Sequence, residues 1–251
     1  MTQLMLGKLP AKKDERTFTL RSILAPSLPP PPPVFDTDMA QPCPLFIDVL
    51  YNDLLGDCVM AGRGHHTLRF EATEQGTLKL ITKPTLKSAV KKEYFIETGG
   101  ADAGLVVLDS LNHWRQNGWT INRRKYSIYA FAAVHPTDHV EVMQAISLLQ
   151  GVGTGFQLPQ SAEDAFYAGK IWDVVHGSRI VGGHYIYFKG YNPIGPVIIS
   201  WGKVCQMTWA FLDYYCDEMF AVVDNVDKFL KGPPRINVPV LNGYLQGVSN
   251  N

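Results

Sequence analysis

Apolar residues recur at helical spacing through the first half of the chain. Small and apolar residues follow Cys58 closely, which is typical of a helix buried in the middle of a domain. Glycines end the next two apolar stretches, as they commonly end helices. The pattern therefore predicts three helices, over about Cys58–Thr73, Leu86–Thr98 and Leu105–Asn117.

The second half of the chain changes to β-type patterns. Runs rich in β-branched and aromatic residues alternate with glycine and proline turns, which favours strands. Helices first and strands later indicate a two-lobed α+β fold with an antiparallel sheet, rather than alternating βαβ units. We expect strands over Lys125–Val134, Gly153–Leu158, His184–Tyr191, Pro196–Trp201 and Met219–Val223, with helices over Val140–Leu149 and Thr208–Tyr215.

Proline and glycine positions divide the chain into three parts. Residues 1–33 form an arm that ends in five consecutive prolines, which are stiff and extended. Residues 34–225 form the folded domain, with a helical lobe at about 46–120 and a β lobe at about 121–225; residues 226–251 form a C-terminal tail. We expect the arm to lie on its own body or on a neighbouring molecule, and we favour a neighbouring protein partner.

Composition excludes several classes of function. Of the 251 residues, 23 are Lys or Arg and 23 are Asp or Glu, so the net charge is zero and favours neither nucleic acid nor a membrane surface as a partner. We find no secretory signal and no membrane-spanning stretch, and expect a protein made in a reducing cytoplasm. The cysteines at 43, 58, 205 and 216 lack zinc-ligand spacing, so we expect no metal and no cofactor.

Two residues stand out as candidates for chemistry. Cys58 opens a helix, where the macrodipole and free N–H groups favour a thiolate; the alternative is a small buried hydrophobe. His184 follows two glycines at the start of a strand. A turn over residues 192–195 would bring it close to Ser200 and Trp201 on the next strand.

The order of these motifs resembles the papain-like cysteine peptidases. The resemblance covers roughly residues 33–225 and includes PPVFDTDMAQ ahead of the cysteine, the Gly99-Gly100 pair before a helix, and Asn117-Gly118-Trp119 after it. It implies a papain-like two-lobe fold, with a central cysteine helix in the helical lobe and an antiparallel β-sheet or barrel in the other. The chain looks most similar to divergent bacterial or bacteriophage members.

The resemblance also implies roles for individual residues. Cys58 takes the place of the nucleophile and His184 that of the base. Trp201 takes the place of the residue that shields the histidine's hydrogen bond from water. Asn52 stands where the family has a glutamine that helps to hold the oxyanion; its amide is also a donor, on a shorter arm.

The sequence departs from the family's pattern close to both reactive residues. Ile199 stands where an asparagine would orient the histidine, and strand alternation predicts that Ser200 faces away from it. Asp57, beside the cysteine, is expected to oppose thiolate formation. The first residues contain no recognisable inhibitory pro-region.

These observations leave two functional hypotheses open. The first is a cysteine peptidase, or another thiol hydrolase acting on a peptide or amide. The second is a catalytically weak or inactive papain-like scaffold with a structural or interaction role. A bacteriophage virion protein, such as a capsid decoration or tail-associated component, is one example, and it would work in an oligomer or virion assembly.

Two further groups of polar residues are assigned structural roles. His65 and His66 are adjacent on a helix and cannot jointly hold one metal, so we expect packing or surface roles. The acidic residues near the end of the β lobe lack calcium-loop spacing and are expected to form a solvated face; they are Asp213, Asp217, Glu218, Asp224 and Asp227.

Overall fold

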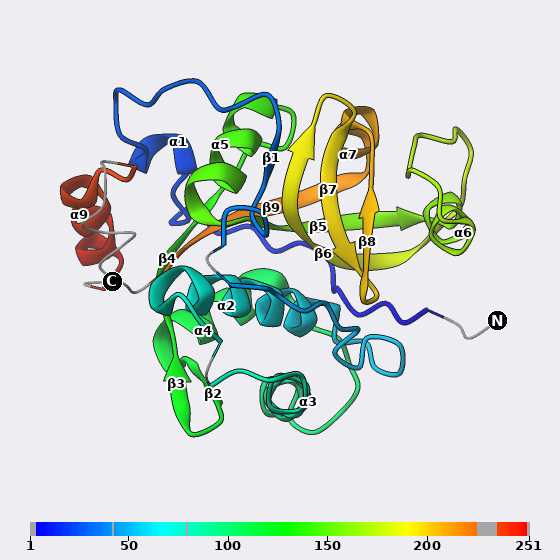
Figure 1. The fold of residues 1–251 in the computed structure, drawn as a ribbon, viewed down its shortest axis with the longest axis horizontal. Helices are drawn as coiled ribbons and strands as arrows, with labels where there is room; N and C mark the ends of the chain where they lie inside the picture. The colour runs from blue at the N-terminus through cyan, green and yellow to red at the C-terminus, as the bar shows by residue number, and fades with distance from the viewer. Residues whose placement is uncertain (1–3, 42, 79, 225–234, 250–251) are drawn as a thin grey trace.

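A computed structural model of the chain describes residues 4–41, 43–78, 80–224 and 235–249. Figure 1 shows two lobes, with helices below and an antiparallel sheet above. The helical lobe holds α2 (Cys58–Gln75), α3 (Lys83–Glu97), α4 (Val107–Asn117) and the hairpin of β2 (Trp119–Ile121) and β3 (Arg124–Tyr126). The predicted α+β, two-lobed architecture is confirmed.

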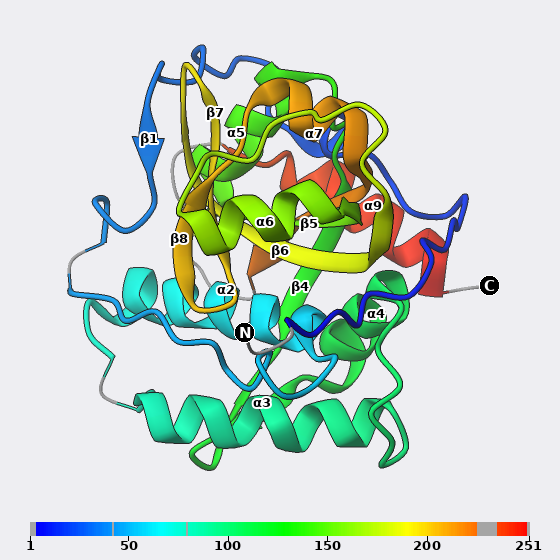
Figure 2. The same cartoon turned by 90° about the vertical axis from the view of Figure 1, so that its right-hand side faces the viewer.

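The strands of the sheet lobe pair antiparallel with one another, and the parallel pairings described there are isolated bridges. Its strands lie in the order β4 (Ile128–Ala133), β9 (Cys216–Asp224), β5 (Val152–Pro159), β6 (Ile180–Asn192), β7 (Gly195–Ser200) and β8 (Lys203–Gln206), and β1 (Phe35–Asp36) pairs with β6. Helices α5 (His139–Leu149), α6 (Gln160–Ala168) and α7 (Trp209–Tyr215) surround it, and α1 (Leu20–Ile23) and α9 (Val238–Ser249) lie at one end (Figures 1 and 2).

The predicted elements agree with the structure within a few residues, with one break. The strand expected over residues 125–134 is interrupted at Ser127, so that β3 joins the small hairpin and β4 joins the main sheet. The sequence analysis missed α1, β1, β2, α6, β8 and α9, most of which are too short to show a clear period. In the described part of the chain, no helix combines the length and the apolarity that a membrane span requires.

Helix α2 crosses the core and is buried from Cys58 to Ala72. Its charged residues are tolerated there because each has a partner of opposite charge. Arg63 lies 2.7 Å from Glu97, and Arg69 lies 2.7 Å from Asp38. These ion pairs connect α2 to α3 and to the chain that follows β1, and they fix the helix that carries the cysteine.

His65 and His66 are buried in aromatic packing, so of the two expected roles the structure has packing and not the surface. The ring of His66 stacks on Phe70, with centroids 5.6 Å apart, and meets the edge of Tyr187 at 4.6 Å. Burial lowers the pKa of each histidine to about 3, so both are neutral at pH 7.

Replacing His66 with phenylalanine is expected to make the free energy of unfolding depend less steeply on pH below pH 6.5. The pKa of His66 is about 3 when folded and 6.5 in its ordinary state, so the unfolded chain binds an extra proton between these values. Stability is therefore lost as pH falls from 6.5 towards 3, by about 1.4 kcal/mol per pH unit for this one group. Urea unfolding at several pH values between 6 and 4 measures the slope. The exposed His176, changed to phenylalanine, is the control and should leave the slope unaltered.

The predicted arm lies along the body from residue 4 onward. Residues 4–9 pass between the two lobes, as the blue trace in Figures 1 and 2 shows. Leu20 and Ile23 of α1 are completely buried against the domain, whereas most of Pro29–Pro33 is exposed. Much of the arm's apolar surface is thus covered by the same chain.

The acidic residues form the solvated face that we expected only in part, with Asp213 and Asp217 exposed. Glu218 and Asp224 are buried, and Glu218 forms an ion pair with Lys8. Asp213 lies 2.8 Å from a histidine of α5. Asp227, together with the first part of the predicted tail, falls outside the described residues.

Candidate functional site

Cys58 begins α2 and is 1% exposed. Its sulfur accepts a hydrogen bond from the backbone N–H of Tyr185, at 3.4 Å. Burial raises the pKa of the Cys58 thiol to about 11, although the backbone N–H groups of Tyr185 and Gly7 oppose this. In this state of the molecule the sulfur is a neutral thiol at pH 7.

His184 lies on β6 and is held on two sides. Its Nε2 is 2.9 Å from Ser200 Oγ. Its ring stacks on the indole of Trp201, with centroids 4.2 Å apart and planes at 13°. Nδ1 is buried and has no hydrogen-bond partner among the described residues. Burial lowers the pKa of His184 to about 3, so the ring is a neutral imidazole at pH 7.

Ser200, which we expected to face away, is the residue that contacts His184. Tyr187 is paired with Ile199, so these two side chains share one face of the sheet. His184 is three residues from Tyr187 and Ser200 is one residue from Ile199, so both lie on the opposite face. The side chains of β7 do alternate between the two faces of the sheet. The expectation that Ser200 faces away was wrong because it placed Ile199 on the same face as His184.

One small cavity brings the five candidate residues together. Its volume is about 10 Å³, close to the least that holds one water molecule. The side chains that line it come from the turn before α2, from α2, and from β6 and the end of β7; among them are Asn52, Cys58, His184, Ser200 and Trp201. The turn at residues 192–195 that joins β6 to β7 is confirmed and carries this arrangement.

Asn52 directs its amide group towards the chain that covers the cavity. Asn52 Nδ2 is 3.2 Å from the carbonyl oxygen of Leu55 and 3.4 Å from that of Met5. Trp201 Nε1 donates to the same carbonyl of Met5, at 3.1 Å. Two donors beside the thiol thus already hold a peptide carbonyl.

Asp57 opposes the thiolate of Cys58, as we expected, but it is a smaller cause than burial. Its side chain is completely buried, and burial raises its pKa to about 8. The carboxyl group is therefore mostly protonated at pH 7. The opposition to ionisation of Cys58 is therefore weak at that pH, and it grows as Asp57 ionises at higher pH.

Residues 4–9, here called the cleft segment, fill the groove between the lobes directly over Cys58. Gly7 O accepts from the N–H of Leu105 at 2.8 Å, and Lys8 N donates to the carbonyl of Gly183 at 3.1 Å. The segment is thus bonded to both lobes. A Cβ at Gly7 would lie 1.7 Å from the carbonyl oxygen of Gly56, so only glycine fits there. The sequence analysis found no pro-region, and a lone glycine in the short apolar stretch LMLGKL gives little signal of this contact.

Away from Cys58, a cluster of two glutamates and a histidine is a second candidate site, and it contains no thiol. Ligand atoms of Glu93, Glu97 and His113 lie within 4.8 Å of one another and could hold a metal ion. Arg63 lies 2.7 Å from Glu97, however, and His113 Nε2 is 3.2 Å from Glu93. These contacts already satisfy much of the cluster's charge within the protein.

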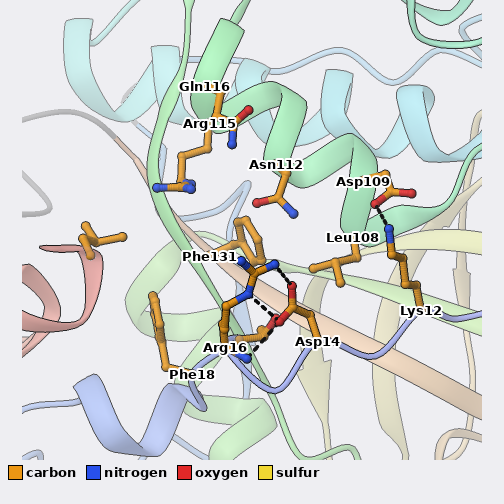
Figure 3. A pocket seen from close by; sticks show the side chains of 12 residues that line it. Lys12, Asp14, Arg16, Phe18, Leu108, Asp109, Asn112, Arg115, Gln116 and Phe131 are labelled. Carbon is orange, nitrogen blue, oxygen red and sulfur yellow. Dashed lines mark hydrogen bonds and ion pairs between the residues drawn. The ribbon is translucent and has the colours of Figure 1, made fainter. Parts of the chain in front are cut away.

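A larger cavity, of about 520 Å³, lies beside α4 and the segment around Asp14 (Figure 3). Its walls are ion-paired: Lys12 Nζ is 2.7 Å from Asp109, and Asp14 is bonded to Arg16. The hydrogen bond from Arg16 lowers the pKa of Asp14 to about 2. Among the described residues that line it there is no cysteine or histidine, so this cavity offers no nucleophile of the kind found at Cys58.

Comparison by sequence finds no matching family model and no similar curated protein. Comparison by structure finds xylellain, a cysteine protease from Xylella fastidiosa, with a TM-score of 0.68 at 12% identity, covering 90% of this chain and 99% of that chain. The ragweed cysteine protease Amb a 11 in its proform has a TM-score of 0.59 at 12% identity, covering 80% of this chain and 69% of that chain.

A third similar structure is procathepsin B S9 from Trypanosoma congolense, with a TM-score of 0.58 at 11% identity, covering 88% of this chain and 86% of that one. At such low identities, structural similarity establishes the fold and not the activity. The arrangement of a cysteine helix against an antiparallel sheet agrees with these structures over most of the chain. The chain therefore has the fold of the papain-like cysteine proteases.

Proposed function

We propose that the protein is a thiol hydrolase that cleaves peptide or amide bonds, with Cys58 as nucleophile and His184 as base. The observation that supports this most is the convergence of a thiol and an imidazole on one cavity at the cleft between the lobes. A carbonyl held by Asn52 and Trp201 beside the thiol supports it further.

The reaction follows from these groups. Ser200 occupies Nε2 of His184, so Nδ1 is the nitrogen available to take the proton of Cys58. The thiolate adds to the acyl carbon, and the oxyanion is held by the Asn52 amide and by N–H groups at the start of α2. The imidazolium then protonates the departing amine, leaving a thioester. Water, deprotonated by the imidazole, hydrolyses the thioester and restores the thiol.

Turnover requires the cleft segment to leave, because it occupies the place of a substrate chain. Its departure exposes Cys58 and His184 to water, which removes the main cause of both pKa shifts. The thiol pKa then falls and the imidazole pKa rises, which favours the thiolate–imidazolium pair that attacks carbonyls. The covered state is thus the resting form of the proposed enzyme.

The second candidate is a catalytically weak scaffold. The partner of His184 is the neutral hydroxyl of Ser200, and Ile199 beside it has no polar group. A neutral partner stabilises an imidazolium less than a carboxylate does, which lowers the expected rate. A scaffold of this kind would act by binding protein partners through the exposed proline run, and a bacteriophage virion component is one form that it could take.

Peptide hydrolysis by the full-length Gly7→Val protein tests the proposal. Unfolded casein labelled at high density with a self-quenched dye is the substrate, because it offers many sequences at once. We expect fluorescence to rise with time and the rise to vanish when Cys58→Ala is added to the same protein. If Cys58 of the Gly7→Val protein alkylates rapidly but casein stays intact, the scaffold hypothesis replaces this one.

A further inference from the structure

The cleft segment buries a single charged side chain, that of Lys8. Its ammonium group lies 2.8 Å from Asp217 Oδ2 and 3.1 Å from Glu218 Oε1, and the side chain is completely shielded from solvent. It also donates to the carbonyl of Leu9, at 3.2 Å. Both carboxylates belong to β9, in the body of the sheet lobe. The pocket therefore belongs to the domain, and the segment supplies only the cation.

The pocket is shaped for a long aliphatic stem. Gly155 on β5 is paired with Glu218 on β9. A Cβ at Gly155 would lie 2.2 Å from Lys8 Cε, so the absence of a side chain there makes room for the lysine. Gln157 Nε2 donates to Asp217 Oδ2, at 2.7 Å, and holds that carboxylate in place.

Departure of the segment leaves the two carboxylates without a counter-ion. Their side chains are 21% and 6% exposed for Asp217 and Glu218. Within the described residues, no cation other than Lys8 forms an ion pair with either of them. The buried Glu218 beside Asp217 favours a ligand that brings positive charge, because a neighbouring cation offsets the burial that raises the pKa of Glu218 to about 7.

The pocket lies close to the reactive groups. Lys8 N donates to Gly183 O, and Gly183 directly precedes His184. The neighbouring Gly7 is one of the residues whose backbone N–H groups favour the Cys58 thiolate. Successive residues of an extended chain are about 3.5 Å apart. A peptide whose side chain occupies this pocket therefore has its backbone beside the Cys58 sulfur about one residue away along the peptide.

We propose that Asp217 and Glu218, with Gly155, form a specificity pocket that binds a lysine or arginine side chain of the peptide substrate near the cleaved bond. Lys8 is the internal occupant of that pocket in the covered state. The inference rests on the proposed hydrolase function, and it gives that function a substrate class: peptides with a basic residue beside the cleavage site.

Peptide binding to a protein that cannot cleave tests the pocket separately from catalysis. The full-length protein carries Gly7→Val and Lys8→Ala, to vacate cleft and pocket, and Cys58→Ala, to prevent turnover. The probe is a fluorescein-labelled pentapeptide with the sequence of residues 5–9, and fluorescence anisotropy gives its Kd. We expect the lysine peptide, and its arginine analogue, to bind about tenfold more tightly than the norleucine analogue, since one charge-assisted contact gives that factor.

The preference for the lysine peptide over the norleucine peptide is expected to fall to within about twofold when Asp217→Asn and Glu218→Gln are added. Asp213→Asn, which removes the same type of charge from the exposed end of α7, is the matched control and should leave it unchanged. Each of the two pocket variants is also tested singly, so that a misfolded double variant does not end the experiment. Equal affinity for the lysine and norleucine peptides, or a preference that survives both substitutions, overturns the pocket. If casein is not cleaved but the lysine peptide still binds more tightly than the norleucine peptide, only the proposed hydrolase function is overturned.

Discussion

Replacing Gly7 with valine is expected to raise the alkylation rate of Cys58 by at least about 100-fold at neutral pH. The side chain cannot be accommodated, because its Cβ would lie 1.7 Å from the backbone oxygen of Gly56. The cleft segment must therefore leave. Hydration then returns the thiol pKa from about 11 towards its ordinary value of 9.0, a change that raises the thiolate fraction about 100-fold.

Iodoacetamide labelling followed by mass spectrometry of the Cys58 peptide measures this rate. The half-buried Cys205 is the internal reference, because its one described side-chain hydrogen bond goes to Lys203 on its own strand and not to the segment, so its rate should not change. Leu9→Val is the matched control within the arm: Leu9 is exposed, and its shortening leaves the segment in place. Equal labelling of Cys58 in the Gly7→Val and Leu9→Val proteins would show that the segment does not protect the thiol.

The sequence predicted the framework of the site because its signals are local. Cys58 opens a buried helix, and His184 lies on a strand that returns through a short turn to Ser200 and Trp201. That strand begins at Ile180 and not at the histidine as we expected, because the pairing with β5 extends past the two glycines. Helix periodicity, glycine stops and strand alternation are each decided within about ten residues. The cysteine helix and the histidine strand could therefore be located before their contact was known.

What the sequence could not predict depends on contacts between distant residues. The bond from Ser200 to His184 depends on which face of β6 meets the helix, and alternation alone leaves the two faces equivalent. The place of Lys8 between Asp217 and Glu218 joins residues more than 200 positions apart. A lysine side chain usually lies in solvent, and only the folded chain shows that Lys8 does not.

The protonation state of Asp57 also could not be predicted from its neighbours in the sequence. A carboxyl beside a thiol is expected to repel the thiolate when both groups are exposed. Complete burial instead leaves the carboxyl mostly neutral at pH 7, since its pKa rises to about 8. Burial is a property of the whole fold, so the neighbouring residues alone could not show how strongly Asp57 opposes the Cys58 thiolate at pH 7.

Replacing Ser200 with alanine is expected to lower peptide hydrolysis by the Gly7→Val protein about 100-fold, in kcat rather than in KM. The hydroxyl is the polar group that holds Nε2 of His184, at 2.9 Å. Without it the ring loses the contact that leaves Nδ1 facing the reaction. Loss of the orienting carboxylate in a related triad costs about 10⁴ in rate, and a neutral hydroxyl contributes less, which gives about 100-fold, or about 2.7 kcal/mol.

The conservative variant Ser200→Thr retains the hydroxyl and is expected to stay within a few-fold of the parent. Ile199→Val, one residue away, is the matched control for packing at the end of β7 and should leave kcat unchanged. Adding Ile199→Asn to Ser200→Ala tests the face assignment, because residue 199 shares the side of Tyr187 and not that of His184. No rescue is expected. Recovery of activity on adding Ile199→Asn, or full activity in Ser200→Ala, would mean that the histidine takes its orientation from position 199 or from the stacked Trp201 instead.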